Sequence, residues 1–415
     1  MKQESLFGTR RSQMTDSIEL TLASLQAYAA DHAHWAIAWS GGKDSTATLT
    51  FVIWAIVAGK VPPPRTLTVL YADTRLEILP LWLAASRIRE ELEDKREALA
   101  AIGVELLVRV VCAPIDERIL VYMLGRGVPP PNNRFRWCTD KAKIKPMVSA
   151  VEESAAAFGL AGAGEKLLLL LGVRVGESAA RDERIALACG KDGAECGQGW
   201  YQTATPEELA AKLSPMLHWR VCHVWEWLRS WAPRPEFGDW STEIIADAYG
   251  GDEAEEINAR TGCVGCNLVE EDRALATVAR MPAWAYLDGL RALKHLWGEL
   301  LRPDRRLRKK GGDRTKSGDL VAKQQRLGPL TFEARRYGLR RILEIQAGVN
   351  AEADRLGRPR VDILNAEEVA RIEALIAAKT WPEGWDGTEP VGNTSLPIFY
   401  GDGSEQPLLW RAGDL

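Results

Sequence analysis

The chain has 415 residues, of which 46% are hydrophobic and 27% are charged, a composition that is ordinary for globular proteins. This length favours two or three domains, and the net charge of −4 neither indicates nor excludes nucleic acid, because local patches decide that. The chain lacks a run of roughly 20 apolar residues, and residues 1–17 lack the apolar segment of a secretory signal. We therefore expect a cytoplasmic protein with no membrane partner, whose seven cysteines are reduced and are candidates for metal binding or catalysis.

Strand-like and helix-like segments alternate in the first part of the chain. The predicted strands span residues 34–40, 66–73, 104–114 and 165–175, and the predicted helices span residues 45–59 and 76–103. The last two strands are continuously apolar, which is typical of parallel strands that are covered on both faces. The alternation predicts an α/β fold with a doubly wound, mainly parallel sheet, whose ligands bind outside the carboxyl ends of the strands.

The pattern changes at about residue 186, where a Gly-rich loop, a Trp-rich helix and a tight cysteine-bearing turn follow one another. The remaining residues are predicted to be mostly helical, apart from a basic loop over 302–317 and an irregular end. Three regions result: an α/β domain over 1–185, a cysteine-containing region over 186–275 and a helical region over 276–415.

Residues 40–45 read SGGKDS and lie where a predicted strand ends and a predicted helix begins. The free backbone N–H groups of a helix N-terminus converge at such a point. Gly41 and Gly42 let an anion approach closely, Lys43 adds a positive charge, and the two serines add hydroxyl donors. The stretch predicts a phosphate-binding loop, without the G-x-x-x-x-G-K-[ST] spacing of the loops that serve γ-phosphate transfer. The alternative is a turn that only starts a helix, which needs one glycine and a cap.

The SGGKDS stretch resembles the signature of the PP-loop ATP pyrophosphatases. Four further segments resemble motifs of the 3′-phosphoadenylyl-sulfate (PAPS) reductases in the same superfamily, and they are YADT at 71–74, RWCTDKAKIKP at 136–146, GVRVGESAAR at 172–181 and PMLHWRVCHVWEWL at 215–228. The resemblance implies a sheet of the adenine-nucleotide alpha-hydrolase type and an ATP–Mg²⁺ site. The residues that it assigns to nucleotide binding are Ser40, Gly41, Gly42, Lys43, Asp44, Ser45, Asp73, Thr74, Gly172, Arg174, Ser178 and Arg181.

The side-chain chemistry of several of these residues also suits a role in nucleotide binding or catalysis. Asp73, at the carboxyl end of a strand, suits Mg²⁺ or a ribose hydroxyl. Arg174 and Arg181 can bind phosphate in a bidentate way, although surface salt bridges are the alternative. Lys43 and Asp44 are predicted catalytic residues: the lysine would offset charge on the leaving pyrophosphate, and the aspartate would hold the metal or cap the helix.

The position of the last cysteine argues against reduction of PAPS. A PAPS reductase needs a mobile C-terminal cysteine, whereas Cys266 is followed by nearly 150 residues without another. Adenylation is favoured instead: a substrate oxygen attacks the α-phosphate of ATP, pyrophosphate leaves, and a sulfur nucleophile then displaces AMP. The alternatives that stay open are thiolation of a tRNA base, PAPS or adenylyl-sulfate reduction, and an ATP-binding regulatory module without turnover.

Features beyond this core resemble the ATP-pyrophosphatase subunit of bacterial DNA phosphorothioate modification systems, including its RFRWCTD element, here at 134–140. The resemblance implies that the substrate is a DNA backbone phosphate and that one non-bridging oxygen is exchanged for sulfur. It also implies three kinds of partner: DNA, a cysteine desulfurase that donates the sulfur, and other subunits of a DNA modification complex.

Four cysteines form the preferred metal-ligand set. Cys263 and Cys266 form a C-x-x-C on a glycine turn, and Cys189 and Cys196 lie on a Gly-rich loop. Four thiolates suit zinc and an iron–sulfur cluster equally, and only the family resemblance favours [4Fe–4S].

Cys138 is a further candidate, with two possible roles. It is either a ligand in place of one cysteine of the Gly-rich loop, or a catalytic carrier of a persulfide. For the second role, the flanking Arg136, Lys141 and Lys143 predict a lowered pKa of its thiol.

The basic loop carries eight Lys or Arg and two Asp between Arg302 and Lys316, and 8 − 2 gives a local charge of +6. A solvated face and a site for an acidic partner are the ordinary interpretations. Glycines interrupt the run and hydroxyl residues follow it, which equally suits a loop that contacts DNA phosphates without reading sequence. The residues predicted to contact DNA are Arg302, Arg305, Arg306, Arg308, Lys309 and Lys310.

Overall fold

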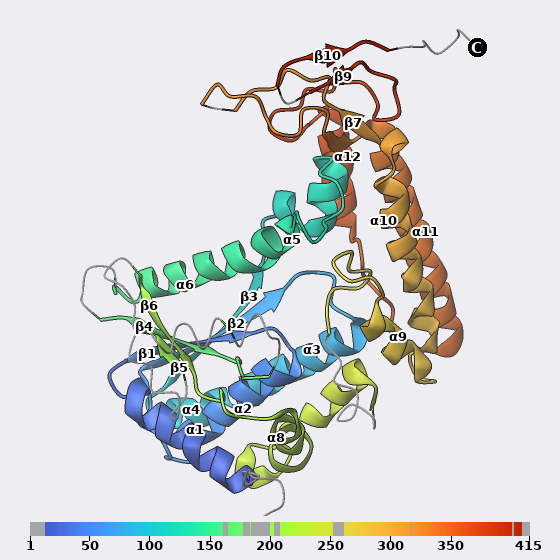
Figure 1. Cartoon of the computed structure of the whole chain (residues 1–415). Helices are drawn as coiled ribbons and strands as arrows, with labels where there is room; N and C mark the ends of the chain where they lie inside the picture. The colour runs from blue at the N-terminus through green and yellow to red at the C-terminus, as the bar shows by residue number, and fades with distance from the viewer. Residues whose placement is uncertain are drawn as a thin grey trace, which may run out of the picture. The chain divides into compact units, whose positions relative to one another are not determined.

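The structure is a computed structural model that describes residues 13–160, 165–176, 183, 200–202, 208–251, 261–315, 317–400 and 402–408 (Figure 1). The chain divides into two compact units. Unit 1 comprises Met1–Asp73, Glu77–Val111 and Lys145–Thr261, and unit 2 comprises Thr74–Leu76, Cys112–Ile144 and Gly262–Leu415, within the described residues. The predicted region 186–275 is thus divided between the units, and the segment Cys112–Ile144 of the predicted first domain belongs to unit 2.

A six-stranded sheet forms the centre of unit 1, in the order β3-β2-β1-β4-β6-β5. Strand β1 pairs in parallel with β2 and β4, β4 pairs in parallel with β6, and β5 is antiparallel to β6. The predicted α/β fold with a mainly parallel sheet is therefore confirmed. The strands span β1 His34–Trp39, β2 Thr66–Asp73, β3 Glu105–Cys112, β4 Leu167–Leu171, β5 Trp200–Gln202 and β6 Ala210–Ser214.

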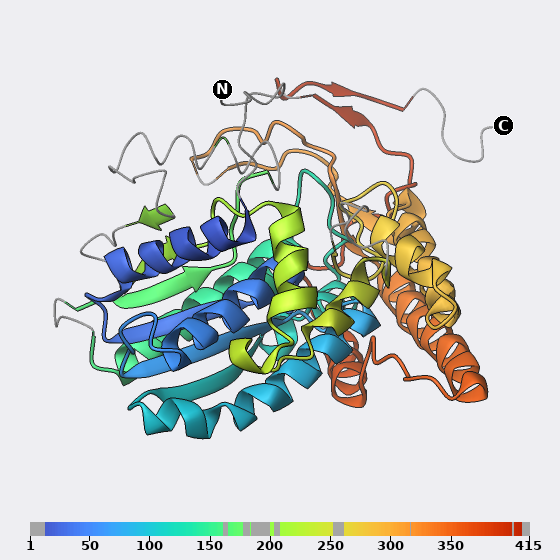
Figure 2. The same cartoon turned by 90° about the horizontal axis from the view of Figure 1, so that it is seen from below.

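Helices cover both faces of this sheet. Helix α6 lies on one face, and α1, α2, α3 and α8 lie on the other (Figures 1 and 2). Under α6, Val151 and Ala155 pack on Leu70 and Leu169 of the sheet. On the opposite side, Phe51 packs against Trp219 and Trp227. The helices of unit 1 are α1 Met14–Ala29, α2 Lys43–Val57, α3 Leu79–Asp94, α4 Arg96–Ala101, α6 Lys145–Ala157, α8 Val221–Glu226, η4 Trp227–Trp231, η5 Pro235–Phe237 and η6 Thr242–Tyr249.

Unit 2 is mostly helical, as predicted for the end of the chain. Its longest helix begins where the Thr331 hydroxyl accepts from the Ala334 N–H, and it ends at Gly357, whose φ of +61° suits glycine. None of the described helices is both long and apolar enough to cross a membrane. The helices are η1 Ile115–Glu117, η2 Val121–Gly125, α5 Trp137–Thr139, η3 Asp140–Ile144, α9 Arg273–Arg280, η8 Ala285–Arg291, α10 Ala292–Leu300, η9 Pro303–Arg305, α11 Phe332–Leu356 and α12 Ala366–Ala377, and the strands are β7 Arg306–Arg308, β8 Leu327–Leu330, β9 Ile398–Phe399 and β10 Glu405–Gln406.

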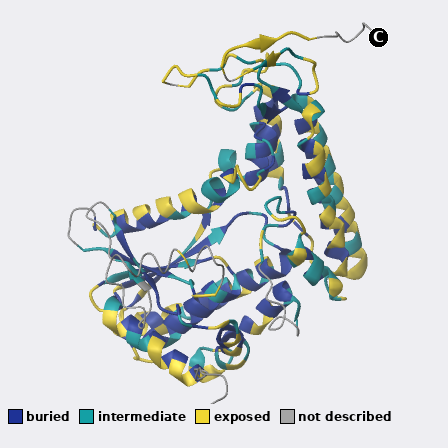
Figure 3. Cartoon of the chain, viewed as in Figure 1, coloured by how far each residue is buried: buried dark blue, intermediate teal, exposed yellow. Residues whose placement is uncertain are grey.

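A buried arginine joins three segments of unit 2. Arg335 is 0% exposed, although α11 shows an exposed face elsewhere (Figure 3). Its guanidinium donates to the carbonyl oxygens of Leu330 (3.1 Å), Gly125 (3.1 Å) and Thr380 (2.7 Å). The rings of Phe332 and Trp381 lie 4.6 and 4.3 Å from its central carbon. Burial lowers the pKa of Arg335 to about 9. The guanidinium thus links η2, β8 and the end of α12 without a carboxylate partner among the described residues.

Asp116 in unit 2 provides a test of stability against pH. Its carboxylate accepts from Arg371 (2.5 and 2.8 Å) and Arg126 (3.0 Å), and these bonds, that of Arg371 first, lower its pKa to about 2. A carboxyl pKa that is lower in the folded state stabilises above the unfolded value of about 3.9, and this contribution is lost as the pH falls towards 2. Because the carboxylate and its two arginine partners are partly exposed to solvent, we expect this contribution to be less than about 1 kcal/mol.

The measurement is urea unfolding of wild type and Asp116→Asn at pH 6 and pH 3. We expect the variant to be less stable at pH 6, with a difference that shrinks at pH 3 and in high salt. An unchanged difference at both pH values would show that the carboxylate charge contributes nothing.

Candidate functional site

The loop at residues 40–45 joins β1 to α2 at the carboxyl end of β1. Gly41 has a φ of +73°, and a Cβ there would lie 3.1 Å from the Ala85 side chain. Gly42 is the N-cap of α2 and, having no side chain, leaves the N–H groups of the first turn to other acceptors. Neighbours of β1 on its two sides are β2 and β4, so the loop lies at the point where strand order reverses. The helix N-terminus therefore presents backbone N–H groups at the edge where ligands bind in such folds.

Both serines of the loop hold its shape. The Ser40 N–H donates to the Ser45 hydroxyl oxygen at 3.2 Å, and the two hydroxyl oxygens lie 3.1 Å apart. The Ser45 hydroxyl donates to the Gly42 carbonyl at 3.1 Å. The serines, predicted as donors to a ligand, are thus engaged with one another within the loop.

A buried cluster of charges lies beside the loop. The Asp44 carboxylate is 3.2 Å from the Lys43 ammonium and 2.5 Å from Nε of Arg174. The three side chains are only 8%, 16% and 6% exposed, in the order Lys43, Asp44, Arg174. Two cations and one anion leave one positive charge in excess, in a place where water cannot screen it well. The cluster is therefore suited to bind an anion.

Gly172 acts by letting β4 approach α2. A Cβ at this position would lie 2.7 Å from the Ser45 Cα and 2.8 Å from its nitrogen, which no side chain tolerates. This close approach brings Arg174, two residues later, to Asp44. The predicted nucleotide residues Lys43, Asp44, Gly172 and Arg174 are thus brought together.

Asp73 lies at the same edge of the sheet. It ends β2, and Tyr71 of that strand pairs with Trp39 of β1. The pKa of Tyr71 is raised by burial first and then by the charges of Glu77 and Asp73, so Asp73 lies near this ring. The same ring lies 3.6 Å from where a Cβ on Gly41 would be. Of the remaining predicted nucleotide residues, Thr74 belongs to unit 2, and Ser178 and Arg181 lie outside the described residues.

Tyr249 contacts the loop, although no sequence motif indicates this contact. It is 3% exposed, and its hydroxyl oxygen accepts from the Lys43 backbone N–H at 3.1 Å. The Lys43 ammonium lies 4.8 Å from the centre of its ring, and the Thr261 hydroxyl is 3.1 Å from its own. Lys43 and Tyr249 are 206 positions apart in the sequence, which explains why no local pattern indicates this pair.

Three of the cysteines singled out in the sequence belong to unit 2. Cys263 and Cys266 flank a turn in which Gly265 has a φ of +66°, and the Cys266 N–H donates to the Cys263 carbonyl at 3.1 Å. The Thr74 hydroxyl is 3.6 Å from the Cys263 sulfur. The described residues contain no group of three or more His, Cys, Asp or Glu that could hold a metal ion. Two of the predicted ligands, Cys189 and Cys196, lie outside the described residues.

The predicted lowering of the Cys138 pKa is wrong. Burial raises the pKa of this thiol most, and the nearby Cys266 raises it further. Hydrogen bonding with Thr139 and the charge of Lys143 lower the pKa, but they do not outweigh burial. Lys141 is paired with Glu117 instead. Charge in the local sequence was therefore a poor guide, because the loss of hydration outweighs it.

Alkylation rates test this directly. We expect iodoacetamide to modify Cys138 at neutral pH more slowly than the exposed Cys222, because the thiolate is the reactive form. The Cys138 rate should keep rising with pH beyond the usual thiol pKa of about 8.5. Peptide mass spectrometry measures both sites in one sample, and faster reaction at Cys138 near pH 7 would contradict the shift.

Two of the six arginines and lysines predicted to contact DNA hold unit 2 together. Arg306 donates to the Gly328 and Leu327 carbonyls, and burial lowers its pKa to about 10. Lys309 lies 2.7 Å from the Glu389 carboxylate and 4.4 Å from the centre of the Trp385 ring.

The other four are more accessible or form weaker contacts. Arg305 lies against the Tyr337 ring at 4.6 Å, Arg302 pairs with Asp304, Arg308 is half-buried, and Lys310 is exposed.

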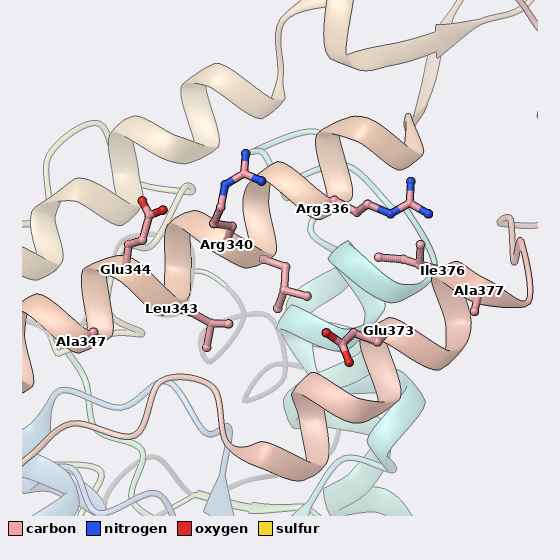
Figure 4. Close-up of a pocket in the computed structure, with 9 residues that line it drawn as sticks. Arg336, Arg340, Leu343, Glu344, Ala347, Glu373, Ile376 and Ala377 are labelled. Atoms are coloured by element: carbon pink, nitrogen blue, oxygen red, sulfur yellow. The ribbon is translucent and has the colours of Figure 1, made fainter.

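A groove of about 610 Å³ lies between α11 and α12 (Figure 4). Its floor is apolar, and Arg336 and Arg340 lie at its rim with Glu344 and Glu373. None of the residues singled out in the sequence lines it.

No protein-family model matches the sequence, and no curated protein matches it. Among solved structures, the chain is similar to the Candida glabrata FMN adenylyltransferase in complex with FMN and the ATP analogue AMPCPP. The two share 15% sequence identity, the alignment covers 53% of this chain and 60% of that one, and the TM-score is 0.28. A likeness at this level carries no argument about the fold or the activity of this chain.

Proposed function

We propose that unit 1 binds ATP at residues 40–45 and uses it to adenylate a substrate oxygen, with release of pyrophosphate. The observation that carries the proposal is the buried cluster of Lys43, Asp44 and Arg174, with its excess positive charge, at the N-terminus of α2, whose N-cap residue is a glycine without a side chain. A triphosphate supplies the missing negative charge, and the backbone of Gly41 and Gly42 lets it approach.

Each residue of the cluster has a role in this reaction. Lys43 and the helix N-terminus offset the charge that develops on the departing pyrophosphate, which is electrostatic catalysis. Asp44, held between Lys43 and Arg174, orients these two cations rather than binding a metal. Asp73, nearly buried at the strand end, is the residue that would hold Mg²⁺, which supplies further charge neutralisation.

The substrate proposed for this activity is a DNA backbone phosphate. Its support is the resemblance of residues 40–45 and 134–140 to the ATP-pyrophosphatase subunit of phosphorothioate modification systems, within the PP-loop and PAPS reductase superfamily. A sulfur nucleophile, supplied by a cysteine desulfurase, then displaces AMP from the activated phosphate. The exposed Lys310 would contact phosphate, and the exposed Arg302 would do so by exchanging its pairing with Asp304 for a phosphate.

The same resemblance implies a [4Fe–4S] cluster, with zinc as the alternative. Cys263 and Cys266 supply a two-thiolate turn for either, with Cys138 in the same unit. The other two ligands of the proposed set, Cys189 and Cys196, lie outside the described residues.

The test uses anaerobically purified full-length protein and ATP labelled at the α-phosphate. We expect release of AMP and pyrophosphate, a higher rate with DNA than with tRNA or without nucleic acid, and bound iron in the protein used. Stimulation by tRNA alone would replace the DNA substrate with a tRNA base. Formation of ADP, or no turnover with any nucleic acid, would contradict adenylation.

A further inference from the structure

We propose that the Tyr249 hydroxyl takes the place of a phosphate oxygen at the first turn of α2, so that a phosphate chain binds only by displacing it. This inference rests on the proposed function, because it concerns the same loop. It assigns to Tyr249 control over which anions the loop accepts.

The contacts of the hydroxyl are those of a bound anion's oxygen. It accepts from the Lys43 backbone N–H at 3.1 Å, at the first helical residue, and it lies 3.3 Å from where a Cβ on Gly42 would be. These are the N–H group and the glycine approach that suit the loop to phosphate. Tyr249 also lies beneath the Lys43 ammonium, 4.8 Å from its ring centre. The phenol and a phosphate oxygen therefore compete for one donor.

The backbone beside Tyr249 allows it to move. Tyr249 is the last residue of η6, and Gly250 and Gly251 follow with φ values of +109° and +67°. Both values lie in the region that favours glycine, so these two residues can rotate with little cost. The Tyr249 ring packs edge-on against Trp225 at 5.2 Å, and its hydroxyl is 3.1 Å from the Thr261 hydroxyl. These contacts hold the Tyr249 ring in place when no phosphate accepts from the Lys43 N–H.

The competition between the Tyr249 hydroxyl and a ligand oxygen favours ligands with several negative charges. A neutral phenol oxygen is a weaker acceptor than a phosphate oxygen, because hydrogen bonds to ionised acceptors are roughly twice as strong as neutral ones. A multiply charged phosphate chain can therefore displace Tyr249, whereas a singly charged anion gains too little from the loop. Tyr249 would thus prevent singly charged anions from binding beside the cluster of Lys43, Asp44 and Arg174.

The experiment measures binding of inorganic pyrophosphate by calorimetry to full-length wild type, Tyr249→Phe, Lys43→Met and Tyr201→Phe. Phenylalanine keeps the ring but removes the competing oxygen. We expect pyrophosphate to bind Tyr249→Phe about three- to tenfold more tightly than wild type, the worth of one neutral hydrogen bond. Tyr201→Phe is the matched control, because its hydroxyl bonds to His32 in unit 1, and its affinity should equal that of wild type.

The outcomes separate this inference from the function on which it rests. Lys43-dependent binding that is unchanged or weaker in Tyr249→Phe overturns the displacement, and weaker binding would make Tyr249 a donor to the ligand. If neither pyrophosphate nor ATP binds wild type, the proposed function fails and this inference fails with it. A Thr261→Val variant removes the second contact of the hydroxyl and should shift the affinity in the same direction as Tyr249→Phe, by a smaller factor.

Discussion

Replacing Lys43 by methionine is expected to lower the rate of pyrophosphate release from ATP about 100- to 1000-fold, the usual loss when one preorganised electrostatic group is removed. The ammonium is only 8% exposed, so its charge acts with little screening on a leaving group at the loop. Methionine keeps the length and apolar volume of the side chain, and Arg174 still neutralises Asp44. The loss should therefore fall on turnover rather than on folding.

The measurement is the rate of release of labelled AMP at saturating ATP, together with a thermal unfolding curve. Lys60→Met is the matched control, because Lys60 is exposed and follows the other end of α2. Its rate should equal that of wild type. A Lys43→Met protein that retains more than about a tenth of the wild-type rate would remove this lysine from the proposed reaction.

Replacing Arg335 by alanine is expected to lower the free energy of unfolding of unit 2 by about 2–4 kcal/mol, among the larger losses for one substitution. The change leaves the carbonyl oxygens of Gly125, Leu330 and Thr380 without this donor in a buried place, and it opens a cavity between two aromatic rings. Relief of the buried charge offsets part of the loss, because burial disfavours the guanidinium in its charged form.

Two further variants serve as comparisons for Arg335→Ala. Arg336→Ala removes the same side chain one residue along α11, where it is exposed, and should change stability by less than about 0.5 kcal/mol. Arg335→Met fills the volume and removes the charge, so it should cost less than the alanine. Urea unfolding followed by circular dichroism measures all three. Equal losses for the two alanine variants would contradict the role of Arg335 as a link between segments.

Sequence patterns predicted four of the six strands of the sheet in unit 1, β1 to β4, but not β5 and β6, which are short and contain polar residues. The predicted strand over 66–73 matches β2, and the glycine loop begins α2 as expected. Helix α1 was not predicted, because its buried face includes Ser17, Thr21 and Ser24 and the sequence therefore lacks the apolar periodicity of a helix. The predicted helix over 76–103 is interrupted at Lys95.

The candidate site was only partly accessible from sequence. The family resemblance assigns Lys43, Asp44 and Arg174 to one site, and the structure brings these three side chains together. The contact of Tyr249, in contrast, depends on tertiary packing between segments that are far apart in the sequence. Burial reversed the expected pKa shift of Cys138, which local charges alone had suggested. The role of Arg306 was also predicted wrongly from its charge. A contact with DNA at the surface was expected, whereas its guanidinium donates to backbone carbonyls inside unit 2.

The division of the chain has a consequence for the order in which it can fold during synthesis. Unit 2 takes Thr74–Leu76 and Cys112–Ile144 from within the sequence of unit 1, and helix η2 of the second segment contacts α11 and α12. These segments leave the ribosome about 200 residues before those helices do, and domains ordinarily fold as they emerge. They must therefore remain unpaired while the sheet around them forms. A nascent chain that ends at Thr261 would carry all six described strands of the sheet and two segments whose partner helices α11 and α12 have not yet been made.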